Sequence, residues 1–253
     1  MQHCKLYING EFIDADDSRT FESRNPYNNS VTAVAARAGA VDVEKAVASA
    51  HHAFYHGNWR HTGPEQRAAV IRRIADGVRT NLVRLVQCEI ADAGATRRKA
   101  ADDVMTSIAF LEQYAVIARD FNKVQPIAAL NNKTGKHCLH YDPVGVCAAI
   151  TPWNFPLKMA LWKLAPALAT GNTVVLKPSE LTPLSAQILA EIIADTELPP
   201  GVVNIIPGFG NEAGQALIQH PKVNKIALTG STATGRSIMA KAAPTLKRLT
   251  LEC

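Results

Sequence analysis

The stretch Thr151-Pro152-Trp153-Asn154-Phe155-Pro156 decides the fold, because it directly follows an uncharged run, residues 144–150. Such a run is typical of a strand that is buried on both faces. The prolines behind it fix the backbone and delay the next helix. We therefore expect Asn154 on a stiff turn at a strand's carboxyl end, where open α/β sheets bind ligands and where an amide suits an oxyanion hole. A purely structural turn, with Trp153 filling the core, is the alternative.

The composition indicates a globular chain without a membrane span. With 253 residues, 47% of them hydrophobic, it holds one large domain or two smaller ones. No run approaches the ~18 apolar residues of a membrane helix, and residues 1–9 lack the long apolar region of a signal peptide. The five cysteines are scattered and have no metal-ligand spacing. We expect a cytoplasmic protein without disulfides and without a metal.

The net charge of +5 raises the question of a nucleic-acid partner. The most basic stretch is Arg97-Arg98-Lys99, and no aromatic residues interleave with it. A solvated helix face explains such a stretch more simply. We therefore expect neither a nucleic acid nor a membrane as a partner.

The first half of the chain has a helical pattern. Apolar residues recur at helical spacing between residues 41 and 121, for example along 71–85. Thr62 and Glu65 have the spacing of a capping box, which predicts a helix start there. Before the helices, residues 6–13 with Asn9-Gly10 at their centre predict a hairpin.

The second half alternates short strands with helices. We expect strands at 144–150, 173–176, 202–206, 225–228 and 249–251, with helices between them, including one at 156–169. Thr182, followed by Pro183, is expected to cap one of these helices. This alternation predicts an α/β fold with a mostly parallel, doubly wound, Rossmann-like sheet behind an N-terminal helical section.

Glycines follow two of the predicted strands, in 207–214 and in 229–237. Glycines between a strand and a helix let backbone N–H groups approach an anion at the helix N-terminus. This arrangement suits a phosphate, although no GxGxxG stands at such a junction. Residues 230–237 also match the P-loop spacing, with Arg236 in place of the lysine, so an ATP-using protein is an alternative. A glycine turn without any ligand is another.

Two further strand ends carry charged residues. Lys177 and Glu180 can grip a ribose through its hydroxyls, and the glutamate disfavours a 2′-phosphate, so NAD is preferred over NADP. An exposed turn is the alternative. Glu252 ends the last predicted strand beside apolar residues, where a carboxylate can serve as a general base. It could equally be a surface carboxylate.

Taken together, these motifs resemble the aldehyde dehydrogenase superfamily, whose members oxidise aldehydes to carboxylates with NAD(P). The matching stretches follow in the family's order: 6–12, 24–26, 150–157, 177–180, 207–214, 229–235 and 251–252. The resemblance covers nearly the whole chain, and the order of the motifs is far more specific than any one of them.

The resemblance implies two catalytic roles. Asn154 would donate to the oxyanion that forms when a cysteine attacks the aldehyde, and Glu252 would activate water to release the acid. The implied cofactor is NAD, with NADP possible. The implied cofactor-binding residues are Ile150, Thr151, Pro152, Trp153, Lys177, Ser179, Glu180, Gly210, Gly214, Thr229, Gly230, Ser231 and Gly235.

The resemblance also implies a domain plan. Residues 1–122 would form the hairpin and the helical section, 123–143 an arm that pairs subunits, and 144–253 an incomplete NAD-binding core. In this family the nucleophilic cysteine follows some tens of residues after the glutamate, whereas Cys253 directly follows Glu252 and does not match its motif. We therefore interpret the chain as the N-terminal portion of a larger, homo-oligomeric enzyme whose catalytic domain is absent here. An inactive NAD-binding module is the alternative.

Overall fold

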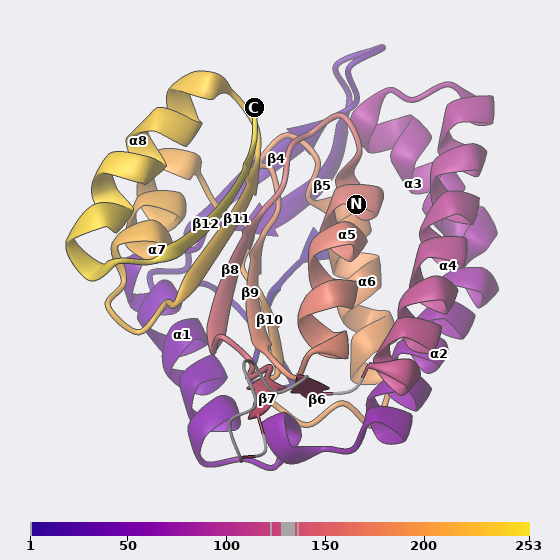
Figure 1. Ribbon diagram of the computed structural model, residues 1–253. Helices are drawn as coiled ribbons and strands as arrows, with labels where there is room; N and C mark the ends of the chain where they lie inside the picture. Colours follow the sequence, from indigo (N-terminus) through magenta and orange to yellow (C-terminus); the bar gives the residue numbers. More distant parts are fainter. Residues whose placement is uncertain (1, 122, 128–134, 136) are drawn as a thin grey trace.

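A sheet of seven strands forms the centre of the computed structural model, which describes residues 2–121, 123–127, 135 and 137–253 (Figure 1). The strand order is β12-β11-β8-β9-β10-β2-β3. Its strands are β2 Leu6–Ile8, β3 Glu11–Ile13, β8 Val146–Ile150, β9 Thr173–Lys177, β10 Val203–Ile205, β11 Lys225–Thr229 and β12 Arg248–Glu252. Two smaller sheets are formed by β1 Gln2–Cys4, β5 Val31–Ala36 and β4 Thr20–Arg24, and by β6 Val124–Ile127 with β7 His137–His140.

The five strands from β12 to β10 run parallel, and the hairpin β2–β3 joins them antiparallel. The register sets Ile150 opposite both Lys177 and Leu228, and Leu228 opposite Leu251. The carboxyl ends of β8, β9, β11 and β12 therefore lie at one edge, the upper one in Figure 1. The predicted mostly parallel α/β fold is confirmed.

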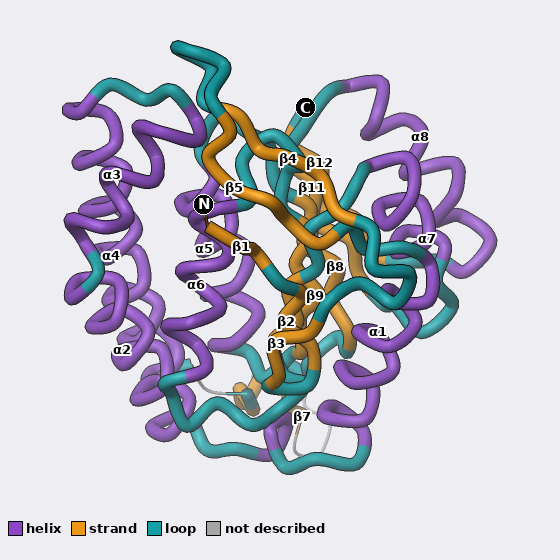
Figure 2. Tube along the Cα trace, turned by 180° about the vertical axis from the view of Figure 1, so that it is seen from behind, coloured by secondary structure: helices purple, strands orange, loops and turns teal. Residues whose placement is uncertain are grey.

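Helices cover both faces of this sheet (Figures 1 and 2). One layer holds α2 to α6, and the other holds α1, α7 and α8. The alternation of side chains along β8 explains both layers, because Cys147 and Ala149 face one core while Val146 and Ala148 face the other. The helices are α1 Ala40–Tyr55, α2 Pro64–Thr80, α3 Leu82–Ala93, α4 Arg97–Asp120, α5 Pro156–Ala169, α6 Leu184–Ala194, α7 Gln215–Gln219 and α8 Thr232–Ala242.

Local sequence signals account for the elements that were predicted well. The expected helix at 156–169 is α5, which has Pro156 in its first turn, where the missing N–H costs nothing. The hairpin at 6–13 turns at Asn9 and Gly10, both with positive φ (54° and 83°), as a tight hairpin turn requires.

Several helix boundaries differ from the sequence prediction. Thr62 does not cap α2, which begins at Pro64; its hydroxyl donates to the Asn58 carbonyl, 3.1 Å away. Thr182 does not cap α6 either: its buried hydroxyl makes no hydrogen bond to any described residue. Asp92 of α3 accepts from the Leu184 N–H instead, at 3.0 Å. The helical stretch at 71–85 is interrupted at Asn81, between α2 and α3.

The sheet β1-β5-β4 was not predicted. The expected arm at 123–143 contains the described hairpin β6–β7 and lies in part outside the described residues. Within the described part of the chain, none of the helices combines the length and the hydropathy that a bilayer crossing needs. No group of three or more potential metal ligands occurs among the same residues.

The cysteines fall into two classes. Cys4, Cys88 and Cys147 are buried, whereas Cys138 and Cys253 are exposed. Burial raises the pKa of Cys4 and of Cys147 to about 12. The buried thiols are therefore protonated and unreactive at neutral pH.

Candidate functional site

The turn after β8 carries the predicted oxyanion donor. The Thr151 N–H donates to the Lys177 carbonyl, 3.2 Å away, so β8 remains paired to its end. The chain then leaves the sheet, and Trp153 and Asn154 are exposed. The Asn154 side-chain amide makes no hydrogen bond within the described residues, so both of its donors are available. The Thr151 hydroxyl, in contrast, is buried and also has no partner there.

The loop after β9 holds a buried ion pair. The Lys177 side chain is only 3% exposed, and its Nζ lies 3.1 Å from Glu180 Oε2 and 2.9 Å from the Pro178 carbonyl oxygen. Burial lowers the pKa of Lys177, and the Glu180 carboxylate opposes that shift. The exposed-turn alternative for Lys177 is therefore wrong.

The pKa of Glu180 reflects opposing effects. Burial raises the pKa of Glu180, but Lys177 and the Gly210 N–H lower it by more, so the net shift is downward and the carboxyl is ionised at neutral pH. Gly214 lies beside the same lysine, and a Cβ there would be 3.8 Å from Lys177 Cδ. The two predicted glycines thus lie next to the Lys177–Glu180 ion pair. The neighbouring Ser179 hydroxyl accepts from the Leu181 N–H at 3.3 Å and shapes this loop.

The segment after β11 is a short loop that leads into α8. Ser231 caps the helix, because its hydroxyl accepts from the Thr234 N–H at 3.2 Å. The free N–H groups of the first turn of α8 therefore lie next to Gly230 and Ser231, as an anion site needs. Gly235 is buried in α8, and a Cβ there would come within 2.5 Å of the Cys253 sulfur.

The same segment argues against a P-loop. Because α8 begins at Thr232, the residues that match the end of that motif, 235–237, lie inside the helix. A P-loop needs a longer loop between the strand and the helix to cradle phosphates. Only Gly230 and Ser231 lie between β11 and α8 here.

A hydrogen-bonded chain of three side chains reaches Glu252. Lys163 Nζ donates to Thr229 Oγ1 at 2.7 Å, and the Thr229 hydroxyl donates to Glu252 Oε2 at 3.0 Å. Burial lowers the pKa of Lys163, and the charge of Glu252 opposes that shift. Sequence analysis did not identify Lys163. The available signal was one of the two lysines in the mostly apolar helix α5, whose partner is 66 residues away.

The segments that follow β8, β9 and β11 and the end of β12 thus meet at one edge of one sheet. Residues 12–253 match the aldehyde dehydrogenase family. The chain belongs to the aldehyde dehydrogenase family.

Individual relatives agree with this membership. The NADP/NAD-dependent aldehyde dehydrogenase PuuC of Escherichia coli (strain K12) is 40% identical over 98% of this chain and 50% of its own length. The fluoroacetaldehyde dehydrogenase of Streptantibioticus cattleyicolor is 42% identical over 97% of this chain and 48% of its own. An NAD+ complex of the aldehyde dehydrogenase from Bacillus cereus superposes with a TM-score of 0.94 at 39% identity, covering 99% of this chain and 50% of that one. The chain thus spans about half the length of these family members.

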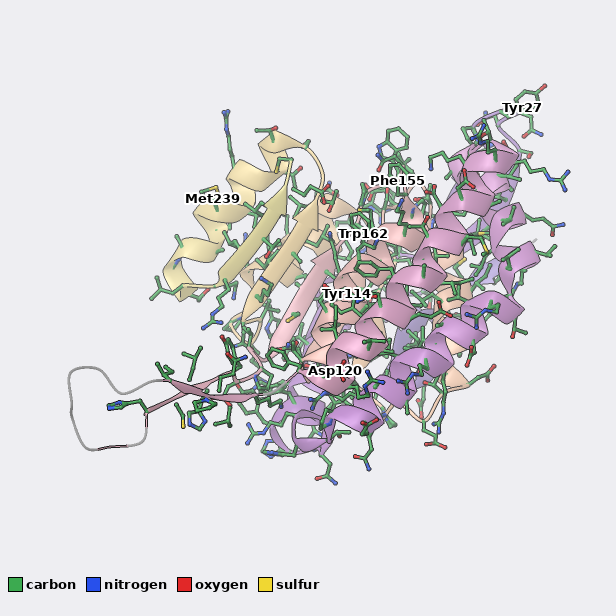
Figure 3. The ribbon with its side chains drawn as sticks, turned by 45° about the vertical axis from the view of Figure 1, so that its right-hand side comes forward. Tyr27, Tyr114, Asp120, Phe155, Trp162 and Met239 are labelled. Carbon is green, nitrogen blue, oxygen red and sulfur yellow. The ribbon has the colours of Figure 1, made fainter. Side chains whose placement is uncertain are left out.

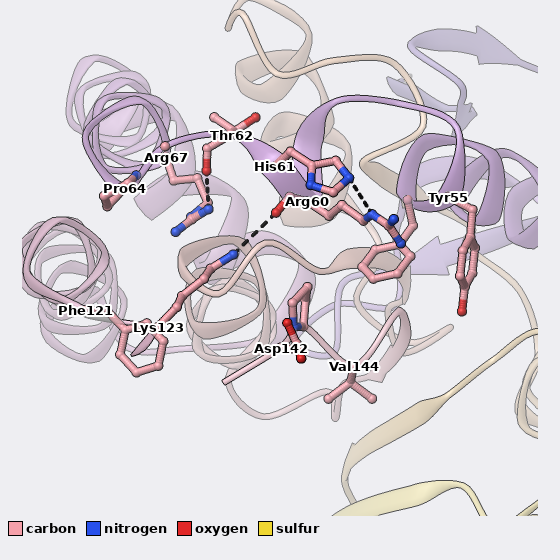
Figure 4. A pocket seen from close by; sticks show the side chains of 13 residues that line it. Tyr55, Arg60, His61, Thr62, Pro64, Arg67, Phe121, Lys123, Asp142 and Val144 are labelled. Carbon is pink, nitrogen blue, oxygen red and sulfur yellow. Dashed lines mark hydrogen bonds between the residues drawn. The ribbon is translucent and has the colours of Figure 1, made fainter. Parts of the chain in front are cut away.

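One cavity is lined by residues of the family's motifs, and a larger cavity is not. One of about 410 Å³ is lined by Trp153 and Glu180, and so lies at the predicted edge. A larger one, of about 790 Å³, lies near the start of β8 and is lined by Arg60, Arg67 and Lys123 (Figure 4). None of the predicted site residues lines this larger cavity. The larger cavity therefore does not coincide with the site predicted from the sequence.

Proposed function

We propose that this chain is the cofactor-binding portion of an NAD-dependent aldehyde dehydrogenase, with NADP as a possible second cofactor. The observation that carries the proposal is the buried Lys177–Glu180 pair at the carboxyl edge of the sheet. A buried lysine and an ionised glutamate are a donor and an acceptor for the two hydroxyls of a ribose. The unpartnered hydroxyl of buried Thr151 at the same edge also fits a polar ligand.

Other residues of this edge suit the remaining parts of the cofactor. Ser231 and the first turn of α8 would hold the pyrophosphate, with Thr229, Gly230 and Gly235 shaping that approach. Ile150, Pro152 and Trp153 would line the cleft beside them. The negative charge of Glu180 disfavours the additional phosphate of NADP. When bound, NAD supplies the hydride acceptor of the reaction.

The remaining chemistry would be divided between two residues of this chain. The exposed Asn154 amide would donate to the oxyanion of the reacting aldehyde. Glu252 would accept a proton from water, held in place by the Thr229 hydroxyl. The attacking thiolate is expected from a part of the protein beyond these residues, so we propose that the 253 residues alone bind NAD without turnover. The complete protein would be a cytoplasmic homo-oligomer, with 123–143 as its pairing arm.

The test is a calorimetric titration of the chain with NAD. In Lys177→Met a hydrogen bond from a charged donor is lost, so the affinity is expected to fall about 10- to 100-fold. Lys222→Met is the control, because it removes the same charge from an exposed position. Equal affinities of the two variants for NAD would refute the role of Lys177.

Further outcomes separate the alternatives. Magnesium-dependent ATP binding without NAD binding would favour the ATP-using protein over the dehydrogenase. Aldehyde oxidation by the purified chain, abolished by Asn154→Ala, would contradict its inactivity. Tighter binding of NADP than of NAD would contradict the role given to Glu180.

A further inference from the structure

The turn that presents Asn154 is exposed and lies beyond the paired end of β8. A donor that stabilises a developing charge has to be held in place before the charge appears. The sheet supports the turn only as far as the Thr151 N–H. Contacts from elsewhere in the chain must therefore fix Asn154.

One such contact comes from the helical section. Lys99, in the first turn of α4, donates from Nζ to the backbone carbonyl of Asn154 at 2.9 Å. The same ammonium group lies 3.9 Å from the centre of the Phe155 ring, a cation–π distance. Lys99 thus holds two successive residues of the turn through a single group.

Asp103 fixes the lysine in turn. Its side chain is only 9% exposed, and Oδ2 accepts from Lys99 Nζ at 2.6 Å. Its other oxygen, Oδ1, lies 3.5 Å from Lys158 Nζ on α5. We call Lys99, Asp103 and Lys158 the charged clamp; it links the first turns of α4 and α5, with Asn154 and Phe155 beside it. Figure 3 shows Phe155 at the upper end of α5, on the side that faces α4.

A second contact, from Glu89, holds the start of α5. Glu89 of α3 is 2% exposed and accepts from the Leu157 N–H at 3.3 Å. The turn is therefore held on one side by a cation at a carbonyl and on the other by the Glu89 carboxyl group, which accepts from an N–H at the start of α5. Both contacts come from helices that precede the sheet strands β8 to β12 in the chain.

We propose that Lys99 is a positioning residue for Asn154, and that the charged clamp keeps the side-chain amide directed at the place where the oxyanion forms. This inference rests on the proposed function of Asn154. Lys99 does not reach the reacting atoms in this role; it acts through the Asn154 backbone. After the loss of Lys99, Asp103 would keep Lys158 Nζ at 3.5 Å as a partner, so we expect the effect of the loss to be local.

The test observes asparagine side chains by NMR in the chain labelled with [¹⁵N]asparagine. The Asn154 side-chain signal is assigned by its loss in Asn154→Ala. In Lys99→Met this signal is expected to move from its position in the unmodified chain, and to sharpen as the turn becomes mobile. Asn172 is the internal reference, because its buried amide donates to Thr170 Oγ1 at 2.7 Å and reports the intact fold.

Arg98→Met is the matched control. It removes the same charge one residue away, but the Arg98 side chain is 94% exposed and lies 3.9 Å from Asp102. The control should leave the Asn154 signal unchanged, and Lys99→Arg should largely restore it. Lys158→Met should produce a smaller shift, because Lys158 Nζ lies farther than Lys99 Nζ from both Asp103, at 3.5 Å, and the centre of the Phe155 ring, at 5.3 Å.

Two results would overturn the proposal. The first is an Asn154 signal in Lys99→Met that matches the unmodified chain. The second is an equal shift of the Asn172 signal, which would mean that Lys99 supports the fold and not this turn. NAD titration of the unmodified chain tests the proposed function separately, since the NMR result does not depend on cofactor binding.

Discussion

The loop after β9 and the end of β12 lie at the same edge of the central sheet, but only the first is buried. Lys177 is 3% exposed and paired, whereas Glu252 is exposed and side chains along β12 alternate between exposed and half-buried. β9 lies between two parallel neighbours, and β12 is the outermost strand. The proposed ribose site is therefore fixed by the interior, and the proposed general base is held mainly by one hydrogen bond, from Thr229.

The largest expected effect tests the difference in burial directly. Leu176 on β9 is completely buried, so Leu176→Ala is expected to lower the free energy of unfolding by about 2–5 kcal/mol. Leu251 on β12 is only half-buried, and Leu251→Ala should cost about 1 kcal/mol. Urea denaturation followed by circular dichroism measures both. Equal losses would show that the two strands are held equally firmly.

An effect of intermediate size concerns the buried carboxyls beneath the proposed NAD-binding loops. Burial raises the pKa of Glu89 from 4.5 to about 7 and that of Asp92 from 3.8 to about 6. Between the ordinary and the raised values, the folded chain binds more protons than the unfolded chain. The free energy of unfolding should therefore fall as the pH rises from about 4 to about 7, with Glu89 contributing on the order of 3 kcal/mol.

Glu89→Gln should flatten this pH dependence, because an amide does not titrate. Urea denaturation at several pH values between 5 and 8 provides the measurement. Glu197→Gln is the control, since that side chain is 80% exposed. If both variants kept the slope of the unmodified chain, the buried carboxyl would not be its source.

The smallest expected effect concerns Glu252, at the exposed end of β12. Glu252→Gln should change the free energy of unfolding by no more than about 0.5 kcal/mol, because it alters an exposed side chain. It should also leave the NAD affinity within about twofold of the unmodified chain, since the charge lies outside the ribose site. Calorimetry and urea denaturation test the two statements. A large loss in either would mean that the end of β12 is more firmly integrated than its exposure indicates.

Sequence analysis succeeded where the determining signals are local. The uncharged run before Thr151 identified β8, and the proline at 156 identified the start of α5. Lys177 and Glu180 were predicted at one strand end, and the structure brings them together because only three positions separate them; their role at a ribose stays a prediction. The resemblance to a family added the order of the motifs, which no single motif could supply.

The error at Thr62 is local, since its hydroxyl donates to a carbonyl only four residues away. The other errors and omissions named here share a physical cause, because they concern contacts between distant residues. Thr182 looked like a helix cap, but the acceptor at that helix is Asp92, 92 residues from its partner Leu184. Lys163 and Thr229 are 66 residues apart, so no local pattern connects them. The contact of Lys99 with the Asn154 carbonyl bridges 55 residues, and Lys99 belongs to a basic stretch that was interpreted as a solvated face.

Because the cysteines differ in burial, the rates at which they react with a thiol reagent can report local opening of the structure. A thiol reagent should modify Cys138 and Cys253 at once, whereas Cys4, Cys88 and Cys147 can react only when their surroundings open. These three lie on β1, α3 and β8, and so sample the small sheet, the helical layer and the central sheet. Their separate labelling rates would rank the opening free energies of the three layers, without any substitution in the chain.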